Sequence, residues 1–171
     1  VPTTVDFAAG EALKEVKIAF DIAVGTTASY TITIPEEDSY VYGSPKVTVN
    51  IKRDYTWLNI GTGYYASQLF GEGWDQPVLE ANIYKLEDCI TKGYPIMFTL
   101  SDDNQELIGW DPQPTGYDKT DYGMLYFAAA GMERKGNVLS FPMQGLVVLD
   151  GGKWGVLYQG FTETLEMPEG F

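Results

Sequence analysis

The sequence predicts an all-β protein: an antiparallel β-sandwich or barrel-like domain with a leading immunoglobulin-like strand set. Short runs of alternating apolar and polar residues recur along the chain, which is the pattern of strands with one buried face. Tyr, Thr and Val are frequent, with 12 Tyr among 171 residues, and 19 Gly supply turns between the runs. No helix signal separates the runs, so we expect helix in less than about a tenth of the residues.

The first part of the chain contains four such runs. Residues 5–7 form a short one, and residues 16–22, 30–34 and 47–51 alternate cleanly. Pro35 and the three acids after it end the third run, because proline cannot donate to a strand ladder. Strands at this spacing are typical of half an antiparallel sandwich, which needs further chain to cover its apolar face.

The stretch 54–65 joins two regions of different composition. A Gly-Thr-Gly kink at residues 61–63 lies between apolar residues, which predicts a bulge or bend where the chain enters a new sheet. We therefore divide the chain into residues 1–53, a partial immunoglobulin-like strand set, and residues 54–171, an antiparallel β domain. No Gly/Ser-rich or Pro-rich linker separates the two regions, so we expect them to fold as one cooperative unit.

The second region contains shorter and less regular runs. The strands predicted there cover residues 78–85, 96–100, 107–110, 124–130, 138–141, 146–149, 155–159 and 162–165. Turns of hairpin type are expected at 136–137 and 150–152. The remaining segments are expected as a loop at 72–77, a helical turn or loop at 86–93, a polar turn at 101–105, a long irregular segment at 111–121 and a loose tail at 166–171.

Charge excludes two kinds of partner. The formal net charge is −13, and residues 54–171 carry 6 basic and 17 acidic side chains, which gives −11 for that region. A surface this negative repels phosphate backbones and anionic headgroups, so we expect no nucleic-acid partner and no binding to a membrane surface. No apolar run is long enough to cross a membrane. The chain begins at Val1 without an initiator Met or a signal segment, and we expect it to be a mature or trimmed region.

The residue inventory argues against common catalytic and metal chemistry. The chain has no His, and Cys89 is its single cysteine, so neither a disulfide within the chain nor a Cys/His zinc site is expected. Cys89 is interpreted as a small buried apolar residue. The acids at 102–103 and at 118 and 121 lack the spacing of a calcium loop and are expected to be solvated. No pair of carboxylates stands out for glycoside hydrolysis, so we expect no enzyme activity, no cofactor and no metal.

The segment TVDFAAGEALKEVKIAFDI, followed by YTITI and VTVNIKRD, resembles the second half of a Calx-beta-like, immunoglobulin-type module. In that family a strand, an Ala-Gly-Glu turn, a strand and a Val-rich final strand follow in this order, and here the match covers about residues 4–54. The resemblance implies an immunoglobulin-like strand set. The acidic residues by which the family binds calcium have no recognisable counterparts, so calcium is not carried over.

Beyond residue 54, the strings YTWLNIGTGYY, VLEANIYKL, DPQPTGYDKTDYG and GNVLSFP resemble the C-terminal β region of Bacteroidetes secreted surface lipoproteins. Such proteins often accompany polysaccharide-utilisation systems and carry glycan-binding or adhesion-like domains. The resemblance implies an extracellular or outer-membrane location, with a lipid anchor on a segment absent from this sequence. It brings no established functional residues that could be transferred.

Aromatic loops are the candidate binding site. A sugar is held when an aromatic ring covers its apolar C–H face and neighbouring carboxylates or amides take its hydroxyls. The candidate carbohydrate-binding residues are Trp74, Trp110, Asp111, Gln113, Tyr117, Asp118 and Tyr122. The alternative is that these rings are core residues at strand ends. Trp57 and Trp154 lie in alternating strands and are interpreted as core.

Two functional classes follow from these observations. The first is a non-catalytic, glycan-binding accessory module on a cell surface, whose partner is a polysaccharide or another glycan. The second is a structural or adhesive domain whose partner is another surface protein and which has no small-molecule ligand. The two differ in whether the aromatic side chains are exposed together or buried.

Overall fold

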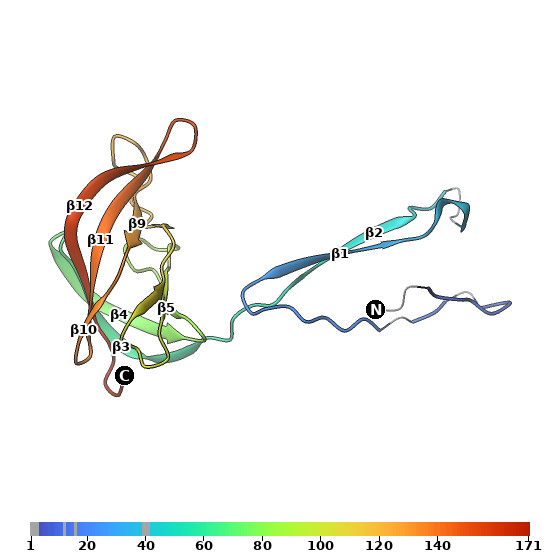
Figure 1. Cartoon of the computed structure of the whole chain (residues 1–171), viewed down its shortest axis with the longest axis horizontal. Helices are drawn as coiled ribbons and strands as arrows, with labels where there is room; N and C mark the ends of the chain where they lie inside the picture. Colours follow the sequence, from blue (N-terminus) through green and yellow to red (C-terminus); the bar gives the residue numbers. More distant parts are fainter. Residues whose placement is uncertain (1–3, 12, 16, 39–41) are drawn as a thin grey trace. The chain divides into compact units, whose positions relative to one another are not determined.

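The computed structural model describes residues 4–11, 13–15, 17–38 and 42–171, and over these residues the chain is all-β with antiparallel sheets (Figure 1). The helix in this part is a single 3-10 turn at Glu36–Asp38 (η1). None of the helical structure described is long or apolar enough to span a membrane. The chain divides into two compact units, Val1–Tyr55 and Thr56–Phe171.

The strands of the first unit are β1 (Thr27–Thr33) and β2 (Lys46–Lys52). Those of the second unit are β3 (Leu58–Ser67), β4 (Glu72–Glu80), β5 (Tyr84–Leu86), β6 (Ile96–Leu100), β7 (Leu107–Gly109), β8 (Gln113–Pro114), β9 (Tyr126–Ala129), β10 (Glu133–Lys135), β11 (Val138–Leu149) and β12 (Lys153–Glu166).

In the first unit, β1 and β2 form a two-stranded antiparallel sheet with one apolar face. Residues directly opposite each other share a face, and the register places Tyr30 opposite Val49. On the other face the Ser29 hydroxyl donates to Oδ1 of Asn50 at 2.7 Å. The two strands predicted at 30–34 and 47–51 are thus confirmed, each to within a few residues.

The strand predicted at 16–22 is wrong over its described part, because residues 17–22 belong to no strand. Their apolar side chains are used in packing instead. The Phe20 ring lies 4.4 Å from the Tyr30 ring, Ile22 is buried, and Arg53 donates from Nη1 to the Ile22 carbonyl at 2.9 Å. Residue 16 lies outside the described residues, and the run at 5–7 is not a strand either.

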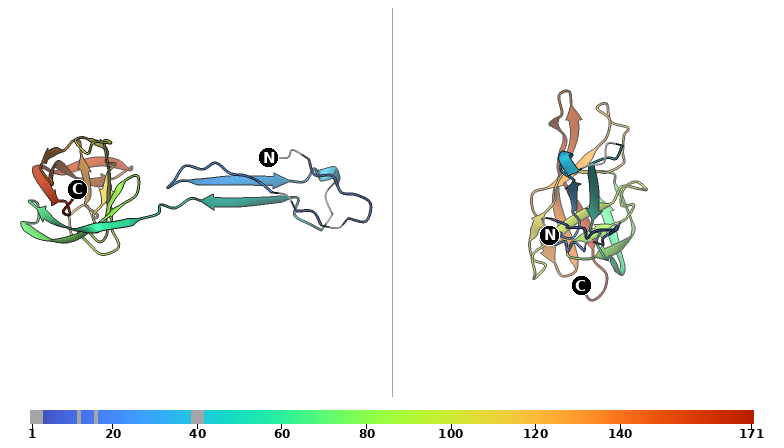
Figure 2. Two further views of the ribbon diagram at one scale, coloured as in Figure 1. Left: turned by 90° about the horizontal axis from the view of Figure 1, so that it is seen from below. Right: turned by 90° about the vertical axis from the view of Figure 1, so that its right-hand side faces the viewer.

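The second unit is a ten-stranded sheet in the order β7-β6-β5-β4-β3-β12-β11-β9-β8, with β10 paired to β11. The sheet curls on itself, as the end-on view in Figure 2 shows. The core is the inner side of this curl. Its buried apolar residues come from β3 to β6, from β9, from β11 and β12, and from the segments between them: Tyr65, Val78, Tyr84, Leu86, Cys89, Ile96, Phe98, Leu100, Leu125, Phe127, Leu139, Phe141, Met143, Phe161, Leu165 and Met167.

A bulge lies near the start of β3, as the glycines at 61 and 63 predict. The register with β4 shifts between Asn59 and Gly61, and the Gly61 amide donates to Oδ1 of Asn59 at 2.9 Å. Gly61 has a φ of 130°, and a Cβ there would lie 2.8 Å from Cβ of Pro168. Glycine is required at this position both by the backbone and by the available space.

The loop predicted at 72–77 is wrong, because these residues are the first part of β4. Trp74 is paired opposite Tyr65 of β3, and Val78 is paired with β5. The pairing of β4 with β5 begins at Val78, after Pro77. Proline is tolerated at position 77 because the β5 side of the strand requires no backbone N–H donor there. The strand predicted at 78–85 is also interrupted, since β4 ends at Glu80 and β5 begins at Tyr84.

Four strands predicted near the C-terminus are two long ones, β11 and β12. Pro142, Gly145 and Gly160 lie in the gaps between the predicted strands, but the ladder continues past them. The register shifts twice, between Met143 and Gln144 and between Gly145 and Leu146, so β12 contains extra residues that bulge out. Strand β10, which is short and polar, was not predicted.

The tail after β12 is packed, so the expectation of a loose tail is wrong. Met167 is buried in the core, and its amide donates to the Asn137 carbonyl at 2.8 Å. The Phe171 ring lies 5.7 Å from the Tyr84 ring, and the Arg134 guanidinium lies over it at 4.6 Å. These contacts fix the tail across the end of the sheet.

Candidate functional site

Trp110, which follows β7, packs against the core rather than projecting from a loop. Its ring stacks on Phe98 at 5.7 Å and lies 5.1 Å from Phe141. The indole Nε1 donates to the Phe127 carbonyl at 3.3 Å. A ring with these contacts anchors strands to each other, and this arrangement supports the core interpretation of Trp110.

Trp74 also faces the inner side of the sheet. It is half-buried, and its ring lies 5.3 Å from that of Tyr65. The indole nitrogen of Trp74 is buried and has no hydrogen-bond partner among the described residues. Trp74 and Trp110 therefore contact different aromatic neighbours, and no measured contact makes them a common platform.

Gln113 in β8 has a structural role. Its Oε1 accepts a hydrogen bond from the Met97 amide at 2.7 Å, and its Nε2 donates to the Met97 carbonyl at 2.5 Å. Met97 lies in β6, near the opposite end of the strand order. Both polar atoms of the Gln113 amide are thus occupied by backbone groups.

Of the other sequence-predicted residues, Asp111 lies just before β8, and Tyr117, Asp118 and Tyr122 lie in the loop between β8 and β9. Tyr117 is half-buried, and its ring meets that of Phe70 edge-on at 5.4 Å. Asp111 and Asp118 are exposed, and Tyr122 is exposed to 57%. Of the seven predicted residues, these last three are the ones available to a ligand on the surface.

A buried polar cluster lies where β3 and β12 pair. The Ser67 hydroxyl and the Leu69 amide donate to Glu163 Oε1 at 3.0 and 3.3 Å. Glu163 Oε2 and the Tyr65 hydroxyl are buried and form no hydrogen bond of good geometry with a described residue. The Tyr65 hydroxyl is still close enough to lower the pKa of Glu163. The sequence analysis missed this cluster. Its signal was the alternation Phe161, Glu163, Leu165, which places a carboxyl among core side chains.

Burial decides the protonation of this cluster. Loss of water raises the pKa of Glu163, and the nearby Tyr65 hydroxyl, together with the hydrogen bonds from Ser67 and the backbone, opposes this rise only in part. Burial likewise raises the pKa of the Tyr65 hydroxyl well above its ordinary value, and the nearby Cys89 and Glu163 add to the rise. Burial raises the pKa of the Cys89 thiol, so Cys89 remains a thiol and behaves as an apolar core residue, as the sequence predicts.

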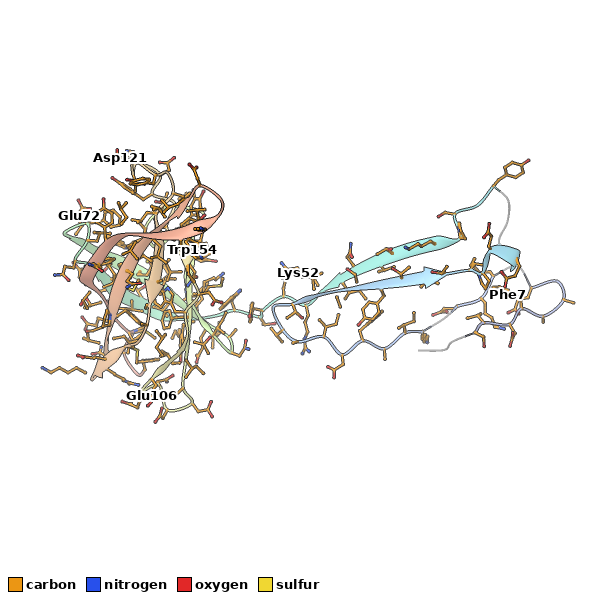
Figure 3. All side chains as sticks on the ribbon, turned by 45° about the horizontal axis from the view of Figure 1, so that its top comes forward. Phe7, Lys52, Glu72, Glu106, Asp121 and Trp154 are labelled. Carbon is orange, nitrogen blue, oxygen red and sulfur yellow. The ribbon has the colours of Figure 1, made fainter. Side chains whose placement is uncertain are left out.

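The outward-facing side of β9, β11 and β12 carries an aromatic pair, Trp154, which is exposed, and Tyr126, which is half-buried. Trp154, labelled in Figure 3, is exposed to 51%, and its ring meets that of Tyr126 edge-on at 5.0 Å. Residues opposite each other share a face, so Val148 lies beside Trp154, and Leu146 lies between Tyr126 and Val156. The interpretation of Trp154 as a core residue is wrong. Its strand alternates, but the apolar residues of this hairpin face both sides.

Two carboxamides continue this face along the strands. Gln144 is two residues from Leu146 on β11 and lies opposite both Gln159 of β12 and Ala128 of β9. Both glutamine side chains are exposed. We call the set Tyr126, Ala128, Gln144, Leu146, Val148, Trp154, Val156 and Gln159 the β9–β11–β12 face.

A hollow of about 700 Å³ adjoins the glutamine end of this face. The hollow is lined by Ala128, Ala129, Ala130, Pro142, Met143, Gln144, Gln159, Gly160, Phe161 and Thr162, so the residues of β9 in its wall are alanines. The face therefore combines an exposed indole ring, hydrogen-bonding amides and a concave surface.

Among the residues that the structure describes, no group of three or more Cys, Asp or Glu side chains is arranged to hold a metal ion. Trp57 precedes β3 and is half-buried, with the Lys85 ammonium 4.4 Å above its ring. Comparison of the chain with protein-family models, with curated proteins and with solved structures gives no match.

Proposed function

We propose that this chain is a non-catalytic accessory module of a cell surface that binds a glycan on the β9–β11–β12 face. The observation that carries the proposal is the exposed Trp154 ring, which contacts the half-buried Tyr126 ring at a centroid distance of 5.0 Å and lies on the same face as Gln144 and Gln159. An extracellular or outer-membrane location belongs to the same proposal, since polysaccharides are met there.

The chemistry of this face suits a sugar. An exposed indole offers a flat apolar surface to the C–H side of a pyranose ring, while the ring edge and its N–H remain available to polar groups. Each carboxamide both donates and accepts, which matches a hydroxyl group that does the same. A pocket with an apolar wall and a few polar groups is the usual form of a small-molecule site.

The position of the site differs from the one that the sequence favours. Trp110 and Gln113 are held by core and backbone contacts, so they are poor candidates for direct sugar contact. Asp111, just before β8, and Asp118 and Tyr122, on the loop after it, remain exposed and form the second candidate position.

A glycan array with the intact chain, run with and without calcium, tests the proposal. We then expect Trp154→Ala to weaken binding to the identified glycan by about 1–3 kcal/mol, as for an aromatic anchor of an interface. Stability should fall by less than about 1 kcal/mol, because the ring is half exposed. Tyr122→Ala is the matched control, since it removes another exposed aromatic ring and should leave binding unchanged. Loss of binding in Tyr122→Ala alone would place the site in the loop instead.

A protein partner is the second candidate function, and the exposed aliphatic side chains of Val148 and Val156 favour it. Aliphatic groups contribute little to sugar binding but are common at protein interfaces. Under this alternative the array is empty, and Val156→Asp, which places a charge in the patch, abolishes association with another surface protein while the protein stays folded.

A further inference from the structure

The hollow beside Gln144 and Gln159 has no charged residue in its wall. Other concave surfaces of the second unit do contain acids: one includes Asp75 and Glu166, another Glu80 and Glu169, and a third Glu72. In a chain with a net charge of −13, an uncharged concave surface on the same face as the exposed Trp154 ring is distinctive. From this we infer that the glycan bound at this face is an uncharged one; the inference rests on the proposed function.

Electrostatics separates a neutral glycan from an acidic one at this site. Residues 54–171 have a net charge of −11, so a uronate or sulfate group approaches against the field of the whole unit. The nearest cation along β12 is Lys153, which lies opposite Leu149 and so alternates to the other side of the strand from Trp154. An acidic group in the hollow would find no cation in the wall to offset its loss of water.

The polar groups in the hollow are of the kind that binds hydroxyls. Gln144 and Gln159 lie directly opposite each other, so their amides reach the same space from two strands. Gly160 is the extra residue of a bulge in β12 and has a φ of 75°. Bulges re-aim the side chains beside them and are common next to binding sites. Here the bulge separates Gln159 on the outer face from Phe161 in the core.

The arrangement also indicates the length of the ligand. Gln144 and Leu146 are two residues apart on one strand, which is about 7 Å. Tyr126 is paired with Leu146, so the aromatic pair lies one such step or more beyond the glutamines. A ligand that touches both the rings and the amides covers more than one sugar unit. We therefore assign the face to an uncharged oligosaccharide or polysaccharide.

Binding to matched probes tests this inference. The probes are soluble neutral glucan, xylan, mannan and galactan, together with polygalacturonate and its highly methyl-esterified form, which is the same sugar with the charge removed. We expect at least one uncharged probe to bind at about 0.15 M salt and polygalacturonate not to bind. The double variant Gln144→Ala, Gln159→Ala should bind the neutral probe about tenfold more weakly. Gln105→Ala, a change in an exposed glutamine of another loop, should bind it as the wild type does.

The outcomes separate the two proposals. Binding of polygalacturonate at least as tight as that of the neutral probes, and weakened by added salt, would overturn the neutral ligand but keep glycan binding. Neutral binding that survives the double glutamine change would overturn the assignment of Gln144 and Gln159. A complete absence of binding to all probes and to the array would remove the proposed function, and the inference with it.

Discussion

The side-chain amide of Gln113 forms two hydrogen bonds with the backbone of Met97, one to its N–H at 2.7 Å and one to its carbonyl at 2.5 Å. These are the two bonds that a neighbouring strand would make with that residue. Since β8 ends the strand order on one side and β6 is next to its other end, this one side chain joins the two ends of the curled sheet. The curl is therefore closed here by an amide side chain rather than by a backbone ladder.

Removing this amide should loosen the closure. We expect Gln113→Ala to lower the free energy of unfolding by about 1–3 kcal/mol, as two hydrogen bonds are lost. Hydrogen exchange gives a more specific measurement, because the Met97 amide should exchange faster in the variant. Gln105→Ala is the control, since Gln105 bonds only within its own turn. Unchanged exchange at Met97 would show that the closure does not depend on Gln113.

Trp110→Ala should be strongly destabilising. The ring stacks on Phe98 and its Nε1 donates to the Phe127 carbonyl, so the change leaves a cavity and removes one hydrogen bond. We expect a loss of about 3–5 kcal/mol in denaturant unfolding. Trp154→Ala, the same substitution at an exposed ring, should cost far less. Equal small losses in both variants would mean that Trp110 is not part of the core.

Stability should depend on pH through Glu163. Burial raises the pKa of Glu163 above its ordinary 4.5 in the folded protein, so the folded state binds the proton more tightly than the unfolded state. The stabilisation from this group is full below about pH 4.5 and is lost as the pH rises through the folded-state pKa. As the pH rises through that pKa, we expect the Glu163→Gln variant to become more stable relative to wild type, because a glutamine side chain does not ionise.

The measurement for Glu163 is the free energy of unfolding by denaturant, for wild type and variant, at several pH values from about 4 to about 8. Glu166→Gln serves as the control, because its carboxyl is exposed on the same strand. A constant difference between wild type and Glu163→Gln across the range would contradict the raised pKa. The other groups facing Glu163 are Tyr65, Ser67 and Cys89, and burial raises the pKa of Tyr65 and Cys89, so neither titrates in this range.

The tail after β12 should contribute to stability. Met167 is buried in the core, whereas Met97 is partly exposed. We expect Met167→Ala to cost about 2–5 kcal/mol and Met97→Ala, the same change at the surface, to cost clearly less. Thermal unfolding of the two variants checks this. A tail that is loose in solution would make the two changes similar and small.

Whether the two units unfold together stays a prediction. The sequence favours one cooperative unit, because residues 1–53 do not cover their own apolar face. The core of the second unit, however, is built from its own residues, 65 to 167. We now expect the fragment 56–171 to be soluble and to melt in a single transition by calorimetry. An insoluble fragment would support the sequence-based expectation of mutual dependence.

The sequence predicts the fold class and the regular strands, and the reasons for its errors are physical. Residues 30–33 of β1 and the whole of β2 alternate apolar and polar side chains without interruption, so period two is enough to find these strands. Strand β12 contains bulges at Gly160 and Leu157, which shift its alternation and make it resemble two strands, and in β11 the gap between the two predicted strands holds Pro142 and Gly145. The local sequence pattern shows periodicity, but it does not show whether the hydrogen-bonded pairing of two strands continues past a glycine.

The candidate site was harder to predict than the fold. Trp110 follows a strand and Trp154 lies in one. Nothing near either residue in the sequence shows that the first is packed against the core and the second is exposed. Burial of Trp110 depends on Phe98 and Phe141, which come from other strands. Exposure of Trp154 depends on the absence of a covering strand over that face among the described residues. Such facts come from the order of strands in the sheet, which a single sequence does not give.

The pairing of β3 with β12 has a consequence for how quickly the second unit folds. Every other neighbouring pair in the sheet joins strands that are close in the chain. This pair instead places Ser67 opposite Glu163, two residues that are far apart in the sequence. The chain between them must be closed into a loop before the contact stabilises anything. We therefore expect folding in milliseconds to seconds, as for other sheets rich in non-local contacts. Until β3 meets β12, two sets of hairpins expose their apolar sides, and this interval is when the chain is most prone to associate with other unfolded copies.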